Sequence, residues 1–138
     1  MMNIIIKEYT NYNENKIVHL YNSVGWMNYT TNLDMLKNAF SNSLKILGAY
    51  IDKKLIGIIR VVGDGHSIVY IQDLLVLPKL QRQEIGSLLL KEILKEYHHV
   101  YQKVLITDNT EKTIAFYKSI AFIQNRDIDC CAFILLNQ

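Results

Sequence analysis

Residues 74–90 read LLVLPKLQRQEIGSLLL, and this stretch decides the fold. It continues a run, residues 67–77, that is nearly all apolar, which predicts a strand in the middle of a sheet with cover on both faces. Pro78 ends that strand, and a short polar loop follows it. Apolar residues at helical spacing then predict an amphipathic helix over residues 85–97. The central feature is therefore a buried strand that enters a helix through a short loop.

A strand–loop–helix junction of this kind can bind an anion. The first turn of a helix exposes backbone N–H groups without partners, at the positive end of the helix dipole. Further N–H groups in the loop would suit a pyrophosphate. Gly86 would allow close backbone approach, and Arg82 offers a forked donor to phosphate oxygens. The alternative is a solvated helix start that happens to carry an arginine.

The rest of the chain supplies short elements on both sides of this junction. A strand at residues 4–6 precedes a helix capped by Asn13, and a second helix begins near Asn32. Later elements follow the same patterns of alternation and helical spacing. We expect a hairpin over residues 44–51 and 55–62, a turn at 63–65, a strand at 101–106, a helix at 110–119, and strands at 122–124 and 130–136.

Composition limits the classes of protein to consider. The chain has 138 residues, half of them hydrophobic and a fifth charged, which predicts one folded domain over residues 1–138. Its net charge of +2 is not concentrated in a basic block, so we expect no nucleic-acid partner. No apolar run predicts a membrane span and the N-terminus does not resemble a signal peptide, so we expect a cytoplasmic protein.

Cysteine and histidine give no sign of a metal site. Cys130 and Cys131 are adjacent, so an ordinary disulfide between them is disfavoured, and we expect buried, weakly reactive thiols. His19, His98 and His99 have no further ligands at metal spacing. We therefore predict no metal.

The chain resembles the GNAT superfamily of N-acetyltransferases in two motifs. That family has an apolar strand ending in V-x-P, followed by a coenzyme A loop of the pattern Q/R-x-x-G-x-G/A, which residues 74–86 follow here. It also has a later helix with an F/L-Y pair before a G-F strand entry, which residues 115–122 follow. Two positions depart from these patterns: Glu84 and Ala121 stand where the family usually has glycine. The Glu84 carboxylate would oppose a bound pyrophosphate unless it points outward.

The resemblance implies the fold and the cofactor. It implies an α/β (α+β) single-domain fold with a central mixed, mostly antiparallel sheet of six to seven strands, flanked by about four helices. The co-substrate would be acetyl-CoA, held along the strand and at the start of the following helix. The resemblance assigns cofactor binding to Leu75, Val76, Leu77, Gln81, Arg82, Gln83, Glu84, Ile85, Gly86, Ser87 and Tyr117.

The same resemblance suggests catalytic roles. The Val76 N–H would polarise the thioester carbonyl, and Tyr117 would protonate the departing thiolate. Asp73 lies in an apolar strand, on the face we expect to be shared with Val69, Ile71 and Leu75. Its carboxylate either accepts the amine proton, directly or through water, or hydrogen-bonds a loop or a cap.

The acceptor is less defined than the cofactor. Trp26, Tyr29, Asp34 and Asp73 are candidate acceptor-binding residues, since aromatic faces with acidic groups suit a cationic amine. Alternatively, Trp26 covers the core and Asp34 only occupies a first helical turn. Antibiotics, polyamines, amino acids and protein amines all remain open as acceptors, and a longer acyl group remains an alternative to acetyl.

Three interpretations are compatible with these patterns. The first is an N-acetyltransferase that acts by direct attack in a ternary complex of enzyme, acetyl-CoA and amine. The second is a non-catalytic acyl-CoA-binding or regulatory module with the same fold, in which Glu84 weakens the cofactor loop. The third is an unrelated α/β interaction module. A homodimer is also an expectation, because the apolar last strand, residues 130–136, could offer an edge.

Overall fold

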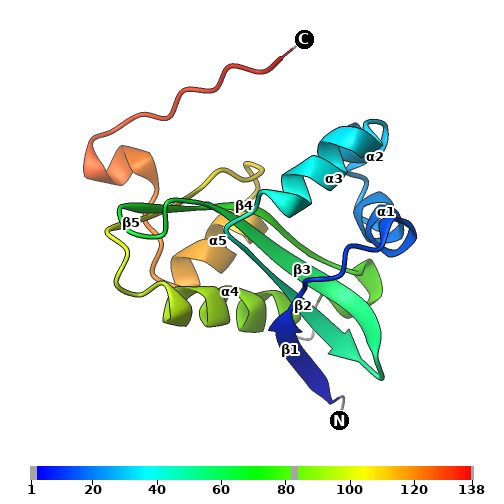
Figure 1. Ribbon diagram of the computed structural model, residues 1–138. Helices are drawn as coiled ribbons and strands as arrows, with labels where there is room; N and C mark the ends of the chain where they lie inside the picture. Colours follow the sequence, from blue (N-terminus) through cyan, green and yellow to red (C-terminus); the bar gives the residue numbers. More distant parts are fainter. Residues whose placement is uncertain (1–2, 82–83, 138) are drawn as a thin grey trace. The chain divides into compact units, whose positions relative to one another are not determined.

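A computed structural model describes residues 3–81 and 84–137 (Figure 1). The chain divides into two compact units, Met1–Leu105 and Ile106–Gln138, which are described separately. The prediction of a single domain stays a prediction. Arg82 and Gln83, both expected to bind cofactor, lie outside the described residues.

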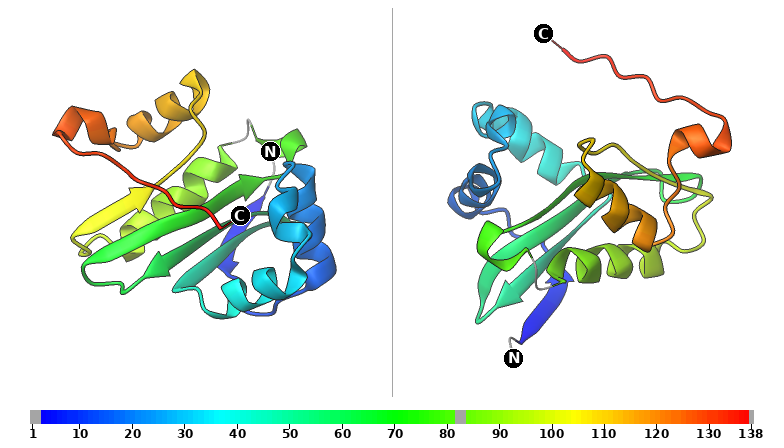
Figure 2. Two further views of the ribbon diagram at one scale, coloured as in Figure 1. Left: turned by 90° about the horizontal axis from the view of Figure 1, so that it is seen from above. Right: turned by 180° about the vertical axis from the view of Figure 1, so that it is seen from behind.

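The first unit is built on a five-stranded sheet in the order β1-β2-β3-β4-β5 (Figures 1 and 2). Neighbours from β1 to β4 are antiparallel, whereas β5 runs parallel to β4. The strands are β1 (Ile4–Glu8), β2 (Lys45–Ile51), β3 (Lys54–Gly63), β4 (Ile68–Val76) and β5 (Gln102–Leu105). The mixed, mostly antiparallel sheet is thus confirmed, but the expected six to seven strands are wrong, because the described residues form five.

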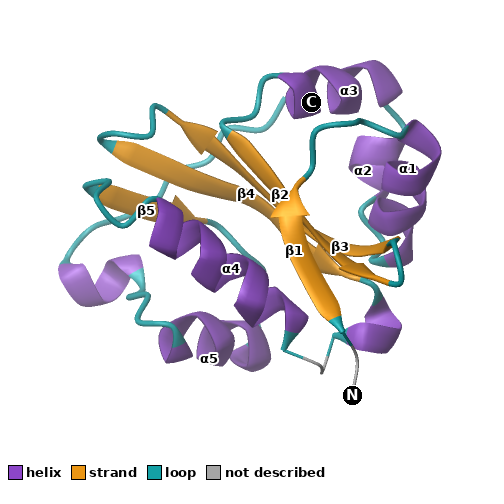
Figure 3. Ribbon diagram, turned by 60° about the horizontal axis from the view of Figure 1, so that its bottom comes forward, coloured by secondary structure: helices purple, strands orange, loops and turns teal. Residues whose placement is uncertain are grey.

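Helices cover the two faces of this sheet (Figure 3). One face carries α1 (Glu14–Ser23), α2 (Met27–Thr30) and α3 (Leu33–Ser41). The other carries α4 (Ile85–Glu96), which follows a short 3-10 turn, η1 (Pro78–Leu80). The Asn13 and Asn32 side chains accept hydrogen bonds from Lys16 N (3.1 Å) and Met35 N (3.2 Å), so both predicted helix caps are present.

A β-bulge in β4 changes which residues share a face. Arg60 pairs with Asp73, but the next residue of β3, Val61, pairs with Ile71, so Gln72 is an extra residue in β4. Asp73 therefore lies on the α1–α3 face together with Leu75, opposite to the face of Ile71. The expectation that Asp73 shares a face with Val69 and Ile71 is wrong, because strict alternation ignored the bulge.

The second unit contains one α-helix among its described residues, α5 (Glu111–Ser119). The Thr110 hydroxyl caps it by accepting from Thr113 N at 3.2 Å. Tyr117 packs edge-on against Phe116 and Phe122, with ring centroids 5.0 and 5.8 Å apart. After the 3-10 turn η2 (Asn125–Ile128), residues 131–137 run extended (Figure 2).

The two strands predicted at residues 122–124 and 130–136 are therefore wrong. Cys130 N donates to the Asn125 carbonyl at 3.1 Å, which folds residues 125–130 into a tight turn instead of a hairpin. A strand also needs a partner, and the described residues of this unit provide none. The helix total differs as well, with five α-helices in the described residues where about four were expected.

Candidate active site

The C-terminal half of β4 has a backbone edge without a strand partner. Leu77 N donates to the Ile56 carbonyl of β3 at 2.9 Å, and hydrogen-bonded pairs alternate along an antiparallel ladder. The N–H of Val76, one residue earlier, consequently points away from β3. It faces the side of β5.

On that side, however, β5 stops early. It pairs with β4 only from Ile68↔Gln102 to Ile71↔Leu105, so no strand of the described residues reaches Val76. The Val76 N–H is thus a donor on an open edge in the interior of the sheet, where the cost of leaving it unpaired favours a ligand acceptor.

The Val76 carbonyl on the same edge is already bound. Gln81 Nε2 donates to it at 3.2 Å, after the chain has turned through η1. This bond ties the loop to the end of β4. The Val76 carbonyl oxygen is therefore occupied by Gln81, whereas the Val76 N–H has no acceptor among the described residues. Such an N–H can donate to the carbonyl oxygen of a ligand.

The helix that follows presents a second group of donors. The first intrahelical bond of α4 joins Leu88 N to the Glu84 carbonyl at 3.0 Å, so the N–H groups of Ile85, Gly86 and Ser87 have no intrahelical acceptor. Ile85 is fully buried and anchors this turn in the core. The donors and the helix dipole together suit a phosphate group.

Glu84 caps this helix in a left-handed conformation, with φ 62° and ψ 15°. Its side chain makes no capping hydrogen bond and is exposed. A left-handed backbone explains why the family pattern has glycine here, since glycine adopts it without steric cost. The same holds for Ala121, where φ is 74°.

Asp73 lies in a buried ion pair rather than on an open surface. Its side chain is 1% exposed, and its Oδ2 accepts from Arg60 Nε and from Tyr21 Oη, both at 2.7 Å. The second oxygen, Oδ1, is buried without a hydrogen-bond partner. Burial, followed by the charge of Asp73, raises the pKa of Tyr21 far above its ordinary value, so this phenol stays a donor.

Arg60 connects the pair to the first helices. Its Nη1 donates to Ser43 Oγ at 3.2 Å, and its guanidinium lies 5.6 Å from the centre of the Phe40 ring. The Asp73 charge raises the pKa of Arg60, against the opposing effect of burial. The pair is thus held by packing, by hydrogen bonds and by charge.

Next to this ion pair lies a cluster of three aromatic residues, Tyr21, Trp26 and Tyr29. Their ring centroids are 5.4 to 6.4 Å apart. Gln72, the bulge residue, donates from Nε2 to Tyr29 Oη at 3.0 Å. Burial, and after it the Asp73 charge, raises the pKa of Tyr29.

The four predicted acceptor residues are therefore only partly brought together. Trp26 and Tyr29 are half-buried beside the buried Asp73. Asp34 is exposed in the first turn of α3, a position where a carboxylate stabilises a helix N-terminus. A role for Asp34 in binding an acceptor stays a prediction.

Tyr117 belongs to the second unit and is described within it. Burial, with a smaller contribution from the Asp108 carboxylate, raises the pKa of its phenol to about 12. The hydroxyl is thus protonated at every pH at which the protein would work. The raised pKa also makes this phenol a weaker proton donor than an unperturbed tyrosine.

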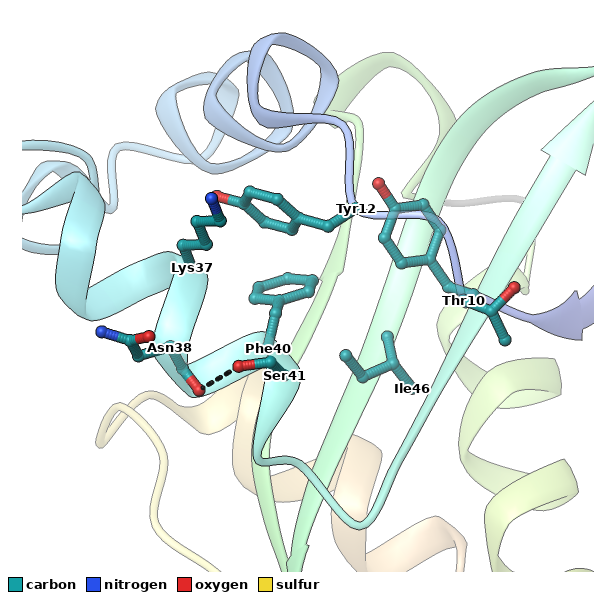
Figure 4. Close-up of a pocket in the computed structure, with 8 residues that line it drawn as sticks. Thr10, Tyr12, Lys37, Asn38, Phe40, Ser41 and Ile46 are labelled. Atoms are coloured by element: carbon teal, nitrogen blue, oxygen red, sulfur yellow. Dashed lines mark hydrogen bonds between the residues drawn. The ribbon is translucent and has the colours of Figure 1, made fainter.

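A separate pocket of about 190 Å³ lies between the segment after β1 and helix α3 (Figure 4). Tyr12 and Phe40 form one wall of it, with ring centroids 5.2 Å apart. None of the predicted site residues lines it. Its lining consists of Tyr9, Thr10, Tyr12, Lys37, Asn38, Phe40, Ser41 and Ile46.

Two negative findings apply to the described residues. No group of three or more His, Cys, Asp or Glu side chains there could hold a metal ion. No helix in those same ranges has the length and apolar character that a bilayer crossing requires.

Sequence reasoning missed Arg60, Tyr21 and Gln72 as members of this site. One signal was present: a lone arginine in one apolar strand and a lone aspartate in the next, on either side of the turn at residues 63–65. Counting outward from that turn would have brought the two charges near each other. The bulge at Gln72 has no such signal.

An inner strand with an open N–H edge, followed through a short loop by a helix whose first N–H groups have no intrahelical acceptor, gives an α/β domain that can bind a ligand with both a carbonyl and a phosphate group. Comparison with known proteins shows the family. The family model described as an acetyltransferase (GNAT) domain matches residues 8–134, and the chain belongs to this family of acetyltransferases.

Two relatives are similar over most of the chain. An uncharacterized N-acetyltransferase of Gracilaria tenuistipitata var. liui is 29% identical over 133 residues, which cover 89% of this chain and 71% of the relative. A solved GNAT-family acetyltransferase from Streptococcus pneumoniae is 43% identical, with a TM-score of 0.89 and 99% of each chain covered.

A more distant structure shares the fold. The PaiA N-acetyltransferase from Thermoplasma acidophilum, solved with coenzyme A, is 19% identical and has a TM-score of 0.69. The match covers 86% of this chain and 89% of that one.

Proposed function

We propose that this protein is an N-acetyltransferase that moves the acetyl group of acetyl-CoA to a primary amine by direct attack in a ternary complex. The observation that carries the proposal is the open β4 edge at Val76, one short loop before the free N–H groups of α4. The backbone of residues 75–77 would hold the pantetheine arm. The start of α4 would hold the pyrophosphate, with Gln81 and Ser87 beside it.

The reaction balances without a covalent enzyme intermediate. The neutral amine nitrogen attacks the thioester carbonyl carbon, the C–N bond forms, and the C–S bond breaks. The Val76 N–H donates to the developing oxyanion, an interaction typically worth about 2.7–4 kcal/mol. In this proposal the coenzyme thiolate takes a proton from Tyr117, the phenolate regains one from water, and the nitrogen releases its own proton to water.

We assign Asp73 a positioning role in this reaction and no direct contact with the reacting atoms. Its carboxylate is buried and already accepts from two donors on one oxygen, so an amine has no direct path to it. Its ion pair with Arg60 would fix β4 beside the bulge residue Gln72, and with it the Gln72–Tyr29 contact on the acceptor side. The half-buried rings of Trp26 and Tyr29 would face the acceptor.

The experiment that tests the function is a thiol-release assay with acetyl-CoA and a panel of amines that includes polyamines, amino acids and peptides. We expect acyl transfer to at least one primary amine, with loss of the rate in a Tyr117→Phe variant. Binding of acetyl-CoA without turnover on any acceptor would favour a module that binds the cofactor but does not react.

One observation favours that second candidate, a non-catalytic acyl-CoA-binding module. Glu84 is the N-cap residue of α4, beside the proposed phosphate site. Its backbone has a left-handed conformation, which disfavours any residue with a side chain. We expect Glu84→Gly to bind acetyl-CoA more tightly, because the substitution removes both the charge and the steric cost. Glu84→Gln removes the charge alone and separates the two effects. Unchanged affinity in both variants would show that Glu84 does not impair the site.

A further inference from the structure

The pocket between the segment after β1 and helix α3 is lined by the first unit alone (Figure 4). It contributes no residue to the proposed reaction. Its volume is about 190 Å³. A cavity of about 150 Å³ is enough to bind benzene, whereas drug-sized ligands need pockets of roughly 300 Å³ or more. The pocket therefore has room for a molecule with a single ring, but not for a whole nucleotide cofactor.

The walls of this pocket are aromatic, and the core holds them in place. The Phe40 ring is 6% exposed and packs edge-on against Tyr21, with ring centroids 6.1 Å apart. The Arg60 guanidinium lies 5.6 Å from the centre of the same ring. Tyr9 and Tyr12 also pack against Phe40, at centroid distances of 6.2 and 5.2 Å. Because these contacts fix Phe40, the wall is formed before a ligand binds.

One hydroxyl in the pocket lining has no partner. The Oη atom of Tyr12 is buried, yet no described residue makes a hydrogen bond to it. The hydroxyl of Tyr9, by contrast, accepts from Asn13 N at 2.9 Å. Burial, and after it the Glu14 charge, raises the pKa of Tyr12, so its phenol stays protonated and can donate. A buried hydroxyl without a partner costs free energy, which an acceptor on a ligand would recover.

The pocket lining carries one charge, and this charge is positive. Lys37 is the only Lys, Arg, Asp or Glu among the eight lining residues. Its side chain extends from α3 toward the Tyr12 hydroxyl (Figure 4). None of the salt bridges in the described part of the chain includes Lys37. A cation and a hydroxyl donor beside an aromatic wall suit a carboxylate that is attached to an apolar body.

We propose that this pocket binds a small monocarboxylate whose apolar body is about the size of a single ring. The body would lie against Phe40 and Ile46, and the carboxylate would accept from Tyr12 Oη and Lys37 Nζ. An amine is disfavoured because the Lys37 ammonium would repel it. The site is independent of acetyl transfer, since none of its lining residues takes part in the proposed reaction.

The experiment is a titration of the full-length protein with benzoate, followed through the backbone amide signals in NMR spectra. We expect saturable shifts at residues 10–12 and 37–41, with a Kd of about 1 mM, an ordinary affinity for so small a ligand. Benzyl alcohol and benzylamine carry the same ring without a negative charge. Each should bind about tenfold more weakly than benzoate, because neither can form a charge-assisted pair with Lys37.

Variants of charged residues test the electrostatic part of the site. Lys37→Met removes the charge but keeps an unbranched side chain, and it should weaken benzoate binding about fivefold. The control is Lys91→Met, the same change at an exposed position of α4, on the opposite face of the sheet, and it should leave the affinity unchanged. Glu14→Gln removes the carboxylate that acts on Tyr12, and it should tighten binding about twofold.

Two tyrosine variants separate ligand binding from stability. Tyr12→Phe should weaken benzoate binding about tenfold, yet the free energy of unfolding of the free protein should stay the same or rise, because no internal hydrogen bond is lost. Tyr9→Phe should do the reverse. It removes the acceptor of Asn13 N, so the free energy of unfolding should fall while the affinity for benzoate stays nearly unchanged.

The other outcomes would overturn the proposal. Without saturable shifts at residues 10–12 and 37–41, the pocket does not bind the carboxylate. Equal affinity for benzylamine would exclude an anion site. Unchanged affinity in Lys37→Met or in Tyr12→Phe would mean that these groups do not hold the carboxylate. Shifts confined to residues 85–87 would place benzoate at the proposed phosphate site instead. None of these readouts needs acetyl-CoA.

Discussion

At two positions the chain has a side chain on a left-handed backbone where the family pattern has glycine. Glu84 has φ 62° and Ala121 has φ 74°. For an L-residue this conformation costs roughly 1–2 kcal/mol, whereas glycine adopts it freely. The sequence alone left open whether Ala121 would have a negative φ, and the positive value means that the substitution costs stability.

We therefore predict that Ala121→Gly raises the free energy of unfolding by about 1 kcal/mol in urea, because it relieves that cost. The matched control is Ala115→Gly, the same substitution at an exposed position inside α5. It should lower stability by about 1 kcal/mol, since glycine is a poor helix former. Equal losses in the two variants would contradict the strained backbone at residue 121.

A second prediction concerns the buried ion pair between Arg60 and Asp73. Arg60→Met should lower the free energy of unfolding by about 3–5 kcal/mol, because it leaves a carboxylate buried without its partner. The double variant Arg60→Met/Asp73→Leu should recover most of that loss, since no buried charge then remains. If Arg60→Met were as stable as the wild type, the ion pair would not contribute to the stability of the fold.

The roles of Asp73 and Tyr117 can be separated by pH. Without a protein base, kcat/KM follows the neutral fraction of the amine, so it should rise about tenfold per pH unit from neutral pH towards the amine pKa, near 10.4 for a lysine-like acceptor. The Tyr117 phenol, with its pKa raised to about 12, stays protonated throughout this range and imposes no decline.

The control is Asp73→Asn. We expect lower stability but the same slope of kcat/KM against pH. A plateau near neutral pH in the wild type that disappears in Asp73→Asn would show that Asp73 accepts the amine proton after all.

At the scale of elements, most of the first unit could be predicted from the sequence. Caps at Asn13 and Asn32 fixed helix starts, and the turn at residues 63–65 fixed the hairpin. Local chemistry decides such features, so a single sequence carries them. The bulge at Gln72 depends on pairing with β3, and therefore alternation along β4 could not reveal it.

The tail shows the same limit in another form. Residues 130–136 have the composition of a strand, and the prediction of a strand followed from it. A strand forms only with a neighbouring strand, and local composition does not specify that neighbour. The candidate site divides in the same way: the motif identified Val76 and the start of α4, but it said nothing of Arg60.

For the whole molecule, the family and the mixed, mostly antiparallel sheet were predicted correctly from two motifs and the order of elements, but the number of strands was not. The acceptor was not, because a fold does not fix a substrate. The residues we propose for the acceptor include Trp26, Tyr29 and Asp34, in and around α2 and α3, which offer aromatic rings and an exposed carboxylate instead of a recognisable motif.

The measurement that tests the central claim most directly is a calorimetric titration of the protein with acetyl-CoA, using desulfo-CoA as a thiol-free comparison. We predict saturable binding of both ligands in the micromolar range, since the β4 edge and the start of α4 would hold the pantetheine arm and the pyrophosphate. Absence of binding by folded protein, in the wild type and in Glu84→Gly alike, would contradict the claim.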